Sequence, residues 1–174
     1  YHDGISADER LAVTGARLLR AKVAEGSSTL ESKARDTLWY NGEQACNASL
    51  ATDGSKKTLF LDFGGETGQK FVGESYGVHE RVLVVDSTGK LISSIKAPSG
   101  YSFDHTEWVR GRSDYAVATL TEASGMHKKI VLINMQDNSL TDLVEGDDLW
   151  QPCLWIPDAL DKSKFEGDGD RAGV

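Results

Sequence analysis

The chain has 174 residues, 39% of them hydrophobic, and a formal net charge of −8, which is sufficient for one ordinary domain with its own core. Its acidic balance, with no cluster of Lys and Arg, excludes nucleic-acid or anionic-membrane binding by charge alone. No stretch approaches the roughly 20 apolar residues that a membrane-spanning helix needs, so membrane insertion is not expected. The chain starts at Tyr1 without a signal peptide, which indicates a processed protein or a piece of a longer one.

Residues 1–40 admit two interpretations. Residues 6–9 satisfy a helix capping box, and a helix would align Leu11, Leu18, Leu19 and Val23. Against a helix, residues 13–15 interrupt the run with Val, Thr and Gly, and Asp8 corresponds to Asp53, which lies 45 residues later. The sequence therefore favours strands in this segment over a helix.

The next segment, residues 41–100, has the clearest strand pattern. Runs rich in β-branched and aromatic residues predict strands at 45–51, 58–63, 81–86 and 91–96, separated by Asp, Ser and Gly turns. The continuous apolar run at 81–86 indicates burial on both faces. Residues 64–77 are rich in Gly and predict an inserted loop.

The same order of strands recurs further along. Strands are predicted at 106–109, 115–119, 129–134 and 140–144, and residues 150–156 open another unit that is not completed. Trp108 and Trp155 lie 47 residues apart, and a period of about 40–45 residues is typical of four-stranded propeller blades. We expect a single all-β domain over 1–174: a β-propeller segment of about three four-stranded blades plus the start of a fourth, with approximate blades at 1–40, 41–100, 101–146 and 147–174.

Acidic and histidine residues precede each predicted inner strand, namely His2, Asp3, Asp104, His105, Asp147 and Asp148. In a propeller this position faces the central channel or its mouth, where such side chains could bind a cation or a sugar. The candidate metal ligands are Asp3, Asp104, His105 and Asp148, with Ca²⁺ as the cation considered. The alternative is that these side chains satisfy loop backbone groups between neighbouring blades. Asp168 and Asp170 in the polar tail are spaced as in calcium loops, but the rest of that pattern is absent.

Aromatic residues near the same positions have two alternative roles. Trp39, Tyr40, Trp108, Trp150 and Trp155 could form a platform for carbohydrate or pack between sheets. We expect Trp108 and Trp155 in the core, while the loop positions of Trp150 and Tyr40 are compatible with exposure. The candidate ligand-binding residues are therefore Asp104, His105, Asp148, Trp150 and Tyr40.

The two cysteines, Cys46 and Cys153, do not fix a compartment. They are either two free thiols or one disulfide that closes a long loop. The disulfide would favour an oxidising compartment.

Residues 148–158, with Trp150, Pro152, Trp155 and Pro157 between two aspartates, resemble the blade-opening motif of TolB-like, WD-like β-propeller repeats of uncharacterised bacterial proteins. Residues 104–108 look like a second copy, and residues 132–143 resemble the strand–turn–strand ending of such a repeat. The resemblance covers 41–158 well and 1–40 loosely. The resemblance is informative about fold and says almost nothing about function. The function we expect is a non-catalytic module for protein or glycan binding or scaffolding, in a periplasmic or secreted protein.

Two other functions remain open at this point. Asp104 and Glu107 could act as the acid–base pair of a carbohydrate-active enzyme. Alternatively, the chain could be a structural subunit of an extracellular assembly, because three and a half units do not reach the 4–8 blades of closed propellers. Another chain, or a second copy of this one, would then complete the ring by strand addition.

Overall fold

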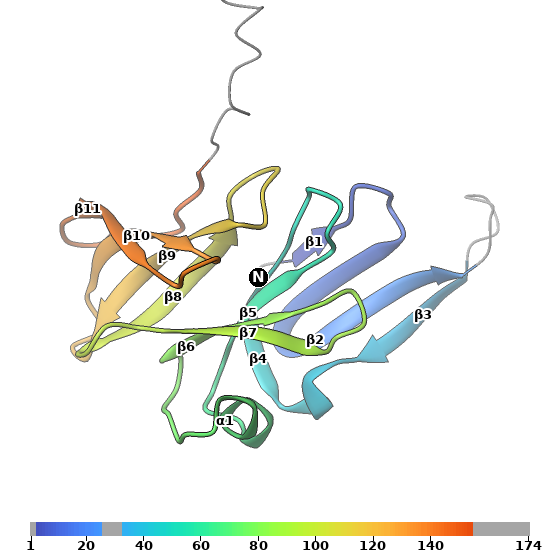
Figure 1. Cartoon of the computed structure of the whole chain (residues 1–174), viewed down its shortest axis with the longest axis horizontal. Coiled ribbons are helices and arrows are strands. Elements are labelled where there is room, and N and C mark those ends of the chain that lie inside the picture. The colour runs from blue at the N-terminus through green and yellow to red at the C-terminus, as the bar shows by residue number, and fades with distance from the viewer. Residues whose placement is uncertain (1–2, 26–32, 155–174) are drawn as a thin grey trace, which may run out of the picture.

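The computed structural model describes residues 3–25 and 33–154 (Figure 1). The fold is almost entirely β, with one 3₁₀ turn, η1 (Tyr40–Gly42), and one short helix, α1 (Glu66–Val72). Within the described ranges, neither helix has the length and hydropathy needed to cross a membrane. The strands are β1 (Asp3–Ile5), β2 (Leu11–Glu25), β3 (Lys33–Leu38), β4 (Gln44–Leu50), β5 (Thr58–Asp62), β6 (Arg81–Val85), β7 (Leu91–Lys96), β8 (Tyr101–Trp108), β9 (Tyr115–Glu122), β10 (His127–Asn134) and β11 (Leu140–Glu145).

The strands form two curled antiparallel sheets, which lie side by side in Figure 1. One sheet has the order β1-β2-β4-β5-β6-β7, with β3 paired to β2, and the other has the order β11-β10-β9-β8. Within 41–100 and within 101–146, each strand pairs with the next along the chain, so each segment is a four-stranded unit. The strands predicted in these two segments are confirmed.

The first segment forms strands, and the helical alternative is wrong. Leu11, Val13, Leu19 and Ala21 are buried at alternating positions, the period of a strand with one covered face. The Ser6 hydroxyl closes a turn by donating to Asp8 Oδ1 at 2.6 Å and accepting from the Leu11 N–H at 3.0 Å, instead of capping a helix.

This segment differs from the expected separate four-stranded blade. With 15 residues, β2 is long enough to pair successively with β1, β4 and β3. Its pairing with β4 fuses the first segment and the second unit into one sheet.

The core has two layers, one on each face of the second unit. Leu59, Leu61, Val82 and Val84 pack against β9 and β10, where Ala116, Ala118, Leu120, Val131 and Ile133 are buried. The alternate residues Phe60, Leu83 and Val85 pack against Leu11, Val13, Leu19 and Ala21 of β2. The burial on both faces predicted from the apolar run at 81–86 is therefore confirmed, and it extends to β5.

The predicted loop insertion between β5 and β6 contains α1 and is attached through one buried carboxylate. Asp62 Oδ2 accepts hydrogen bonds from the Tyr40 hydroxyl at 2.6 Å, the Tyr76 hydroxyl at 2.9 Å and the Gly65 N–H at 3.0 Å. Burial, and then these bonds to Asp62, raise the pKa of both tyrosines, so both hydroxyls remain donors. Gly68 of α1 lies directly over this group, where a Cβ would overlap both hydroxyl oxygens.

The Gly68→Ala substitution should therefore destabilise the protein by about 1–3 kcal/mol, because the added methyl group forces the tyrosines away from Asp62. The measurement is the free energy of unfolding in urea. Lys70→Ala, at an exposed position of the same helix, is the matched control and should change it by less than about 0.5 kcal/mol. Equal stabilities of the two variants would contradict the packing at Gly68.

Candidate functional site

The first strands of the second and third units carry a β-bulge at corresponding positions. The register shifts between Cys46 and Ser49 in β4 and between Asp104 and Glu107 in β8. Each bulge contains a residue in the left-handed region, Asn47 with φ 51° and His105 with φ 46°. Such bulges redirect side chains and are common beside functional sites.

The opening of the next unit carries the same signature. Gln151 has φ 47° and lies 46 residues after His105, whereas His105 lies 58 residues after Asn47 because of the insertion that contains α1.

Four chain segments that open successive units lie next to one another. Gly4 and Ile5 of β1, Leu50 of β4, Trp108 of β8 and Cys153 all line one pocket of about 300 Å³. Side chains join the neighbouring bulges: Ser49 Oγ donates to Glu107 Oε2 at 2.7 Å and accepts from the Trp108 N–H at 3.2 Å. Hydrogen bonds therefore join β4 to β8, and the Arg110 N–H, which donates to the Leu154 carbonyl at 3.2 Å, joins the chain after β8 to the last described segment.

Three polar side chains converge at the bulge in β8: Asp104, His105 and His127. Asp104 Oδ2 lies 2.9 Å from His127 Nε2 and 3.5 Å from His105 Nε2. Successive residues of a regular strand point to opposite faces, so Asp104 and His105 lie together only because of the bulge. His127 reaches them from the start of β10, two strands away in the sheet.

The segment that follows β11 partly covers this cluster. The Leu149 N–H donates to the His127 carbonyl at 3.1 Å, and Thr119 Oγ1 donates to the Leu149 carbonyl at 3.1 Å. The Trp150 indole consequently stacks on the His127 ring with 3.8 Å between centroids, and lies 5.2 Å from the His105 ring. Trp150 is still 56% exposed, so the stacked indole borders solvent.

The cluster favours an ionised Asp104. Burial alone would raise the pKa of this carboxyl, but the hydrogen bond with His127 and the charge of His105 outweigh burial and hold the pKa below its usual value. Oδ1 accepts from the Asn47 side-chain amide at 3.0 Å and from the His105 N–H at 2.8 Å. Among the described residues, Asp104, His105 and His127 form the one group of three whose ligand atoms could hold a metal ion.

The other predicted site residues do not join the cluster. Asp148 is exposed and, like Asp3 on β1, is not one of the three grouped residues. His2 and Trp155, as well as Asp168 and Asp170, lie outside the described residues. Trp108 is buried and Trp150 exposed, in agreement with the interpretation of the aromatic residues. Sequence reasoning missed His127; the available signal was a histidine at the start of the third strand of a meander whose first strand carries Asp104.

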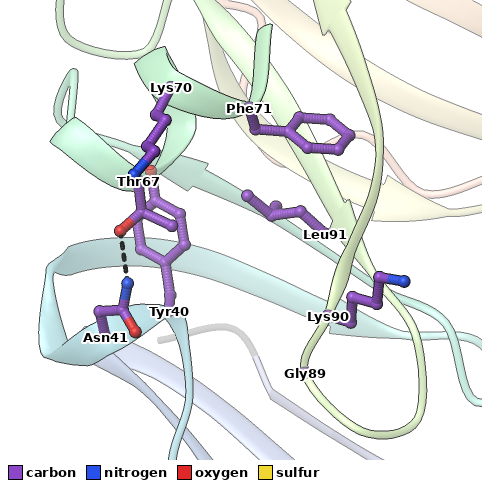
Figure 2. Close-up of a pocket in the computed structure, with 8 residues that line it drawn as sticks. All are labelled: Tyr40, Asn41, Thr67, Lys70, Phe71, Gly89, Lys90 and Leu91. Atoms are coloured by element: carbon purple, nitrogen blue, oxygen red, sulfur yellow. Dashed lines mark hydrogen bonds between the residues drawn. The ribbon is translucent and has the colours of Figure 1, made fainter.

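Tyr40 is buried, contrary to the exposure considered for it, because its hydroxyl is bound to Asp62. Its ring lines a separate pocket of about 410 Å³ between η1, α1 and the β6–β7 turn (Figure 2). Lys70 and Lys90 flank this pocket, and Phe71 and Leu91 supply apolar surface. Tyr40 therefore belongs to the attachment of α1 and not to the Asp104 cluster.

Both cysteines are free thiols in the structure, so the disulfide interpretation is not supported. Cys46 Sγ lies 3.2 Å from His79 Nε2, while Cys153 is exposed. Burial, with smaller contributions from the charges of Asp104 and Asp62, raises the pKa of Cys46 to about 12.

Comparison with known proteins places the fold and not the function. No protein-family model matches the sequence, and no curated protein matches it. Among solved structures, hydrazine synthase from Kuenenia stuttgartiensis, a propeller-containing protein, has a similar fold with a TM-score of 0.53. Sequence identity is 12%, and the similarity covers 87% of this chain but 37% of that chain. The similarity extends to the fold alone.

The environment of Cys46 predicts its reactivity. Because burial raises the pKa of Cys46, its thiol stays protonated at pH 8, and the thiolate is the reactive form. We expect a disulfide reagent to modify one thiol per native chain rapidly, and the Cys153→Ser variant to react far more slowly. Unfolding the variant in urea should restore rapid reaction. Two thiols reacting at similar rates in the native protein would contradict the burial of Cys46.

Proposed function

We propose that the chain is a segment of a TolB-like β-propeller and works as a non-catalytic binding module, with a glycan or a protein as ligand. The observation that carries this proposal is the exposed Trp150 indole stacked beside Asp104, His105 and His127. An indole face beside a carboxylate and imidazoles suits a sugar ring or a peptide group, because apolar contact and directional hydrogen bonds are offered together.

Two features of the fold support a propeller. The second unit is packed between neighbours on both faces, as a blade within a ring is. The four segments that open successive units lie together, as the innermost strands of adjacent blades do. Periplasmic or extracellular location remains part of this proposal and rests on the resemblance of residues 104–108 and 148–158.

The contacts of the two candidate catalytic carboxylates favour binding over glycoside hydrolysis. Asp104 is held by Asn47 and His127, and Glu107 Oε2 accepts from Ser49 at 2.7 Å. Both carboxylates are thus engaged in fixing the bulges to one another. A glycosidase needs both carboxyl groups directed at the substrate, whereas these two are directed at Asn47, His127 and Ser49 of the protein itself.

Replacing Trp150 by Ala should remove most of the binding surface. We expect affinity for the best glycan found on an oligosaccharide array to fall at least tenfold, measured by titration calorimetry, because one stacked aromatic ring is lost. Phe71→Ala, which removes a 44% exposed aromatic residue of α1, is the matched control and should leave affinity unchanged. Equal affinities of wild type and Trp150→Ala would place the ligand elsewhere.

A second candidate function, subunit of a larger β assembly, is favoured by the third unit. One of its faces is buried against the second unit, but on the other face Val144 is 47% exposed and lies opposite the half-buried Ile130. In the second unit, β6, which corresponds to β10, is buried from Val82 to Val85 and so is covered on both faces. A further β unit stacked on this face would cover the apolar side chains.

Self-association through this face is open to direct measurement. If copies of the chain stack there, light scattering after gel filtration should give a mass above 18.9 kDa, and Val144→Lys should return the particle to that mass. Ile92→Lys, at a 42% exposed position of β7, is the control and should not change the mass. A monomer at all concentrations would contradict assembly by self-association.

A further inference from the structure

We propose that Asp104, His105 and His127 bind one divalent transition-metal ion, with Zn²⁺ as the best-suited ion. Each of the three side chains offers one ligand atom, and these atoms lie within 4.8 Å of one another. The site does not depend on the binding function proposed above.

The distances suit such an ion. In a four-coordinate site with bonds of about 2.0–2.1 Å, neighbouring ligand atoms are roughly 3.4 Å apart. The distances from Asp104 Oδ2 to His127 Nε2, 2.9 Å, and to His105 Nε2, 3.5 Å, lie on either side of that value. Small side-chain rotations would therefore convert the existing cluster into three ligands around one ion, with the fourth position left for water or another ligand.

The groups around the cluster orient it as the outer shell of a metal site does. The Asn47 side chain and the His105 N–H both donate to Asp104 Oδ1, which leaves Oδ2 directed at the two imidazoles. Trp150 covers the His127 ring and limits its rotation. Partners of this kind fix the geometry of ligands and commonly contribute 10–100-fold to metal affinity.

Charge and ligand type select the ion. One ionised carboxylate and two neutral imidazoles carry a charge of −1, which is complementary to a divalent cation. Two nitrogen donors suit Zn²⁺, Cu²⁺ or Ni²⁺ and not Ca²⁺, which takes six to eight oxygen ligands. The Ca²⁺ considered from the sequence is therefore replaced by a transition metal, and His127 takes the place of Asp3 and Asp148 in the ligand set.

The site joins parts of the chain that are distant in the sequence. It lies where Asn47 of the second unit, strands β8 and β10 of the third unit and the Leu149–Trp150 segment meet. A bound ion would lock β8 to β10 and, through the His127 backbone, hold the start of the following unit. Metal binding should accordingly raise the melting temperature as well as give a heat of binding.

The test is calorimetric titration of the metal-free protein with Zn²⁺ at pH 7.5, in a Cys153→Ser background that removes the exposed thiol. We expect one equivalent to bind and to raise the melting temperature. Asp104→Asn and His127→Gln should each weaken binding at least tenfold and abolish the thermal shift. His79→Gln alters a histidine outside the cluster and should bind Zn²⁺ like the parent protein.

Two further measurements keep the outcome decisive. Asn47→Ala retains all three ligands and should weaken Zn²⁺ binding about tenfold, because Asp104 loses its hydrogen bond from the Asn47 amide. This variant tests the site even if a variant of one of the three ligands fails to fold. Lowering the pH below about 6 should release the ion, because protonated imidazoles cannot coordinate it. Stoichiometric binding that survives in Asp104→Asn and His127→Gln, or no binding by the parent protein, would overturn the proposal.

Discussion

Burial of the β5–β6 pair on both faces is the constraint on which the other features depend. Phe60, Leu83 and Val85 face one neighbour, and the alternate residues Leu59, Leu61, Val82 and Val84 face the other. A strand pair that is apolar on both sides has to be covered on both, and at about 25 cal/mol per Å² this burial dominates the stabilisation of the fold. It brings side chains of β2, from the curled part of the same sheet, to one face of the β5–β6 pair and the third unit to the other face. The bulged strands β4 and β8 are thereby placed side by side, and the polar cluster forms at their junction.

The cluster also depends on backbone conformations that most residues avoid. A residue other than glycine in the left-handed region costs of the order of 1 kcal/mol, less for Asn, and such residues gather at functional sites. Asn47 and His105 occupy equivalent bulges in the first strands of the second and third units, and Gln151 in the segment after β11 has the same left-handed conformation. The side chains at these three positions differ: Asn47 and Gln151 carry an amide, and His105 carries an imidazole. The repeat supplies a fixed geometry, and the third unit alone, among the described residues, adds a carboxylate and a second histidine to it.

Strand order and strand bounds were largely predictable because their signals are local. Alternating burial, turn residues and the apolar run at 81–86 identify β4–β11 to within a few residues, apart from the start of β8. The pairing of β2 with β4, which joins the first segment to the second unit, was not predictable. It depends on which part of the 15-residue strand β2 remains unpaired after β1 and β3 have paired with it. Asp104 and His105 were candidates because they precede the strand predicted at 106–109, whereas in the structure they lie within β8, and Asp148, chosen on the same ground, is exposed. His127 was missed because its approach to Asp104 spans two strands and depends on the bulge; its place at the start of the third strand of the meander was the one signal, and the bulge itself could not be read from the sequence.

The insertion between β5 and β6 shows where a unit of this kind can accommodate an added segment. It lengthens the spacing between Asn47 and His105 to 58 residues, yet both bulges keep their geometry. The insertion is attached through Asp62 Oδ2 at the end of β5, which accepts from Tyr40, Tyr76 and Gly65, and not through the bulges. A unit of this kind can therefore carry an added segment at this connection without loss of register, and the pocket beside Phe71 is lined by no residue of the bulged strands β4 and β8.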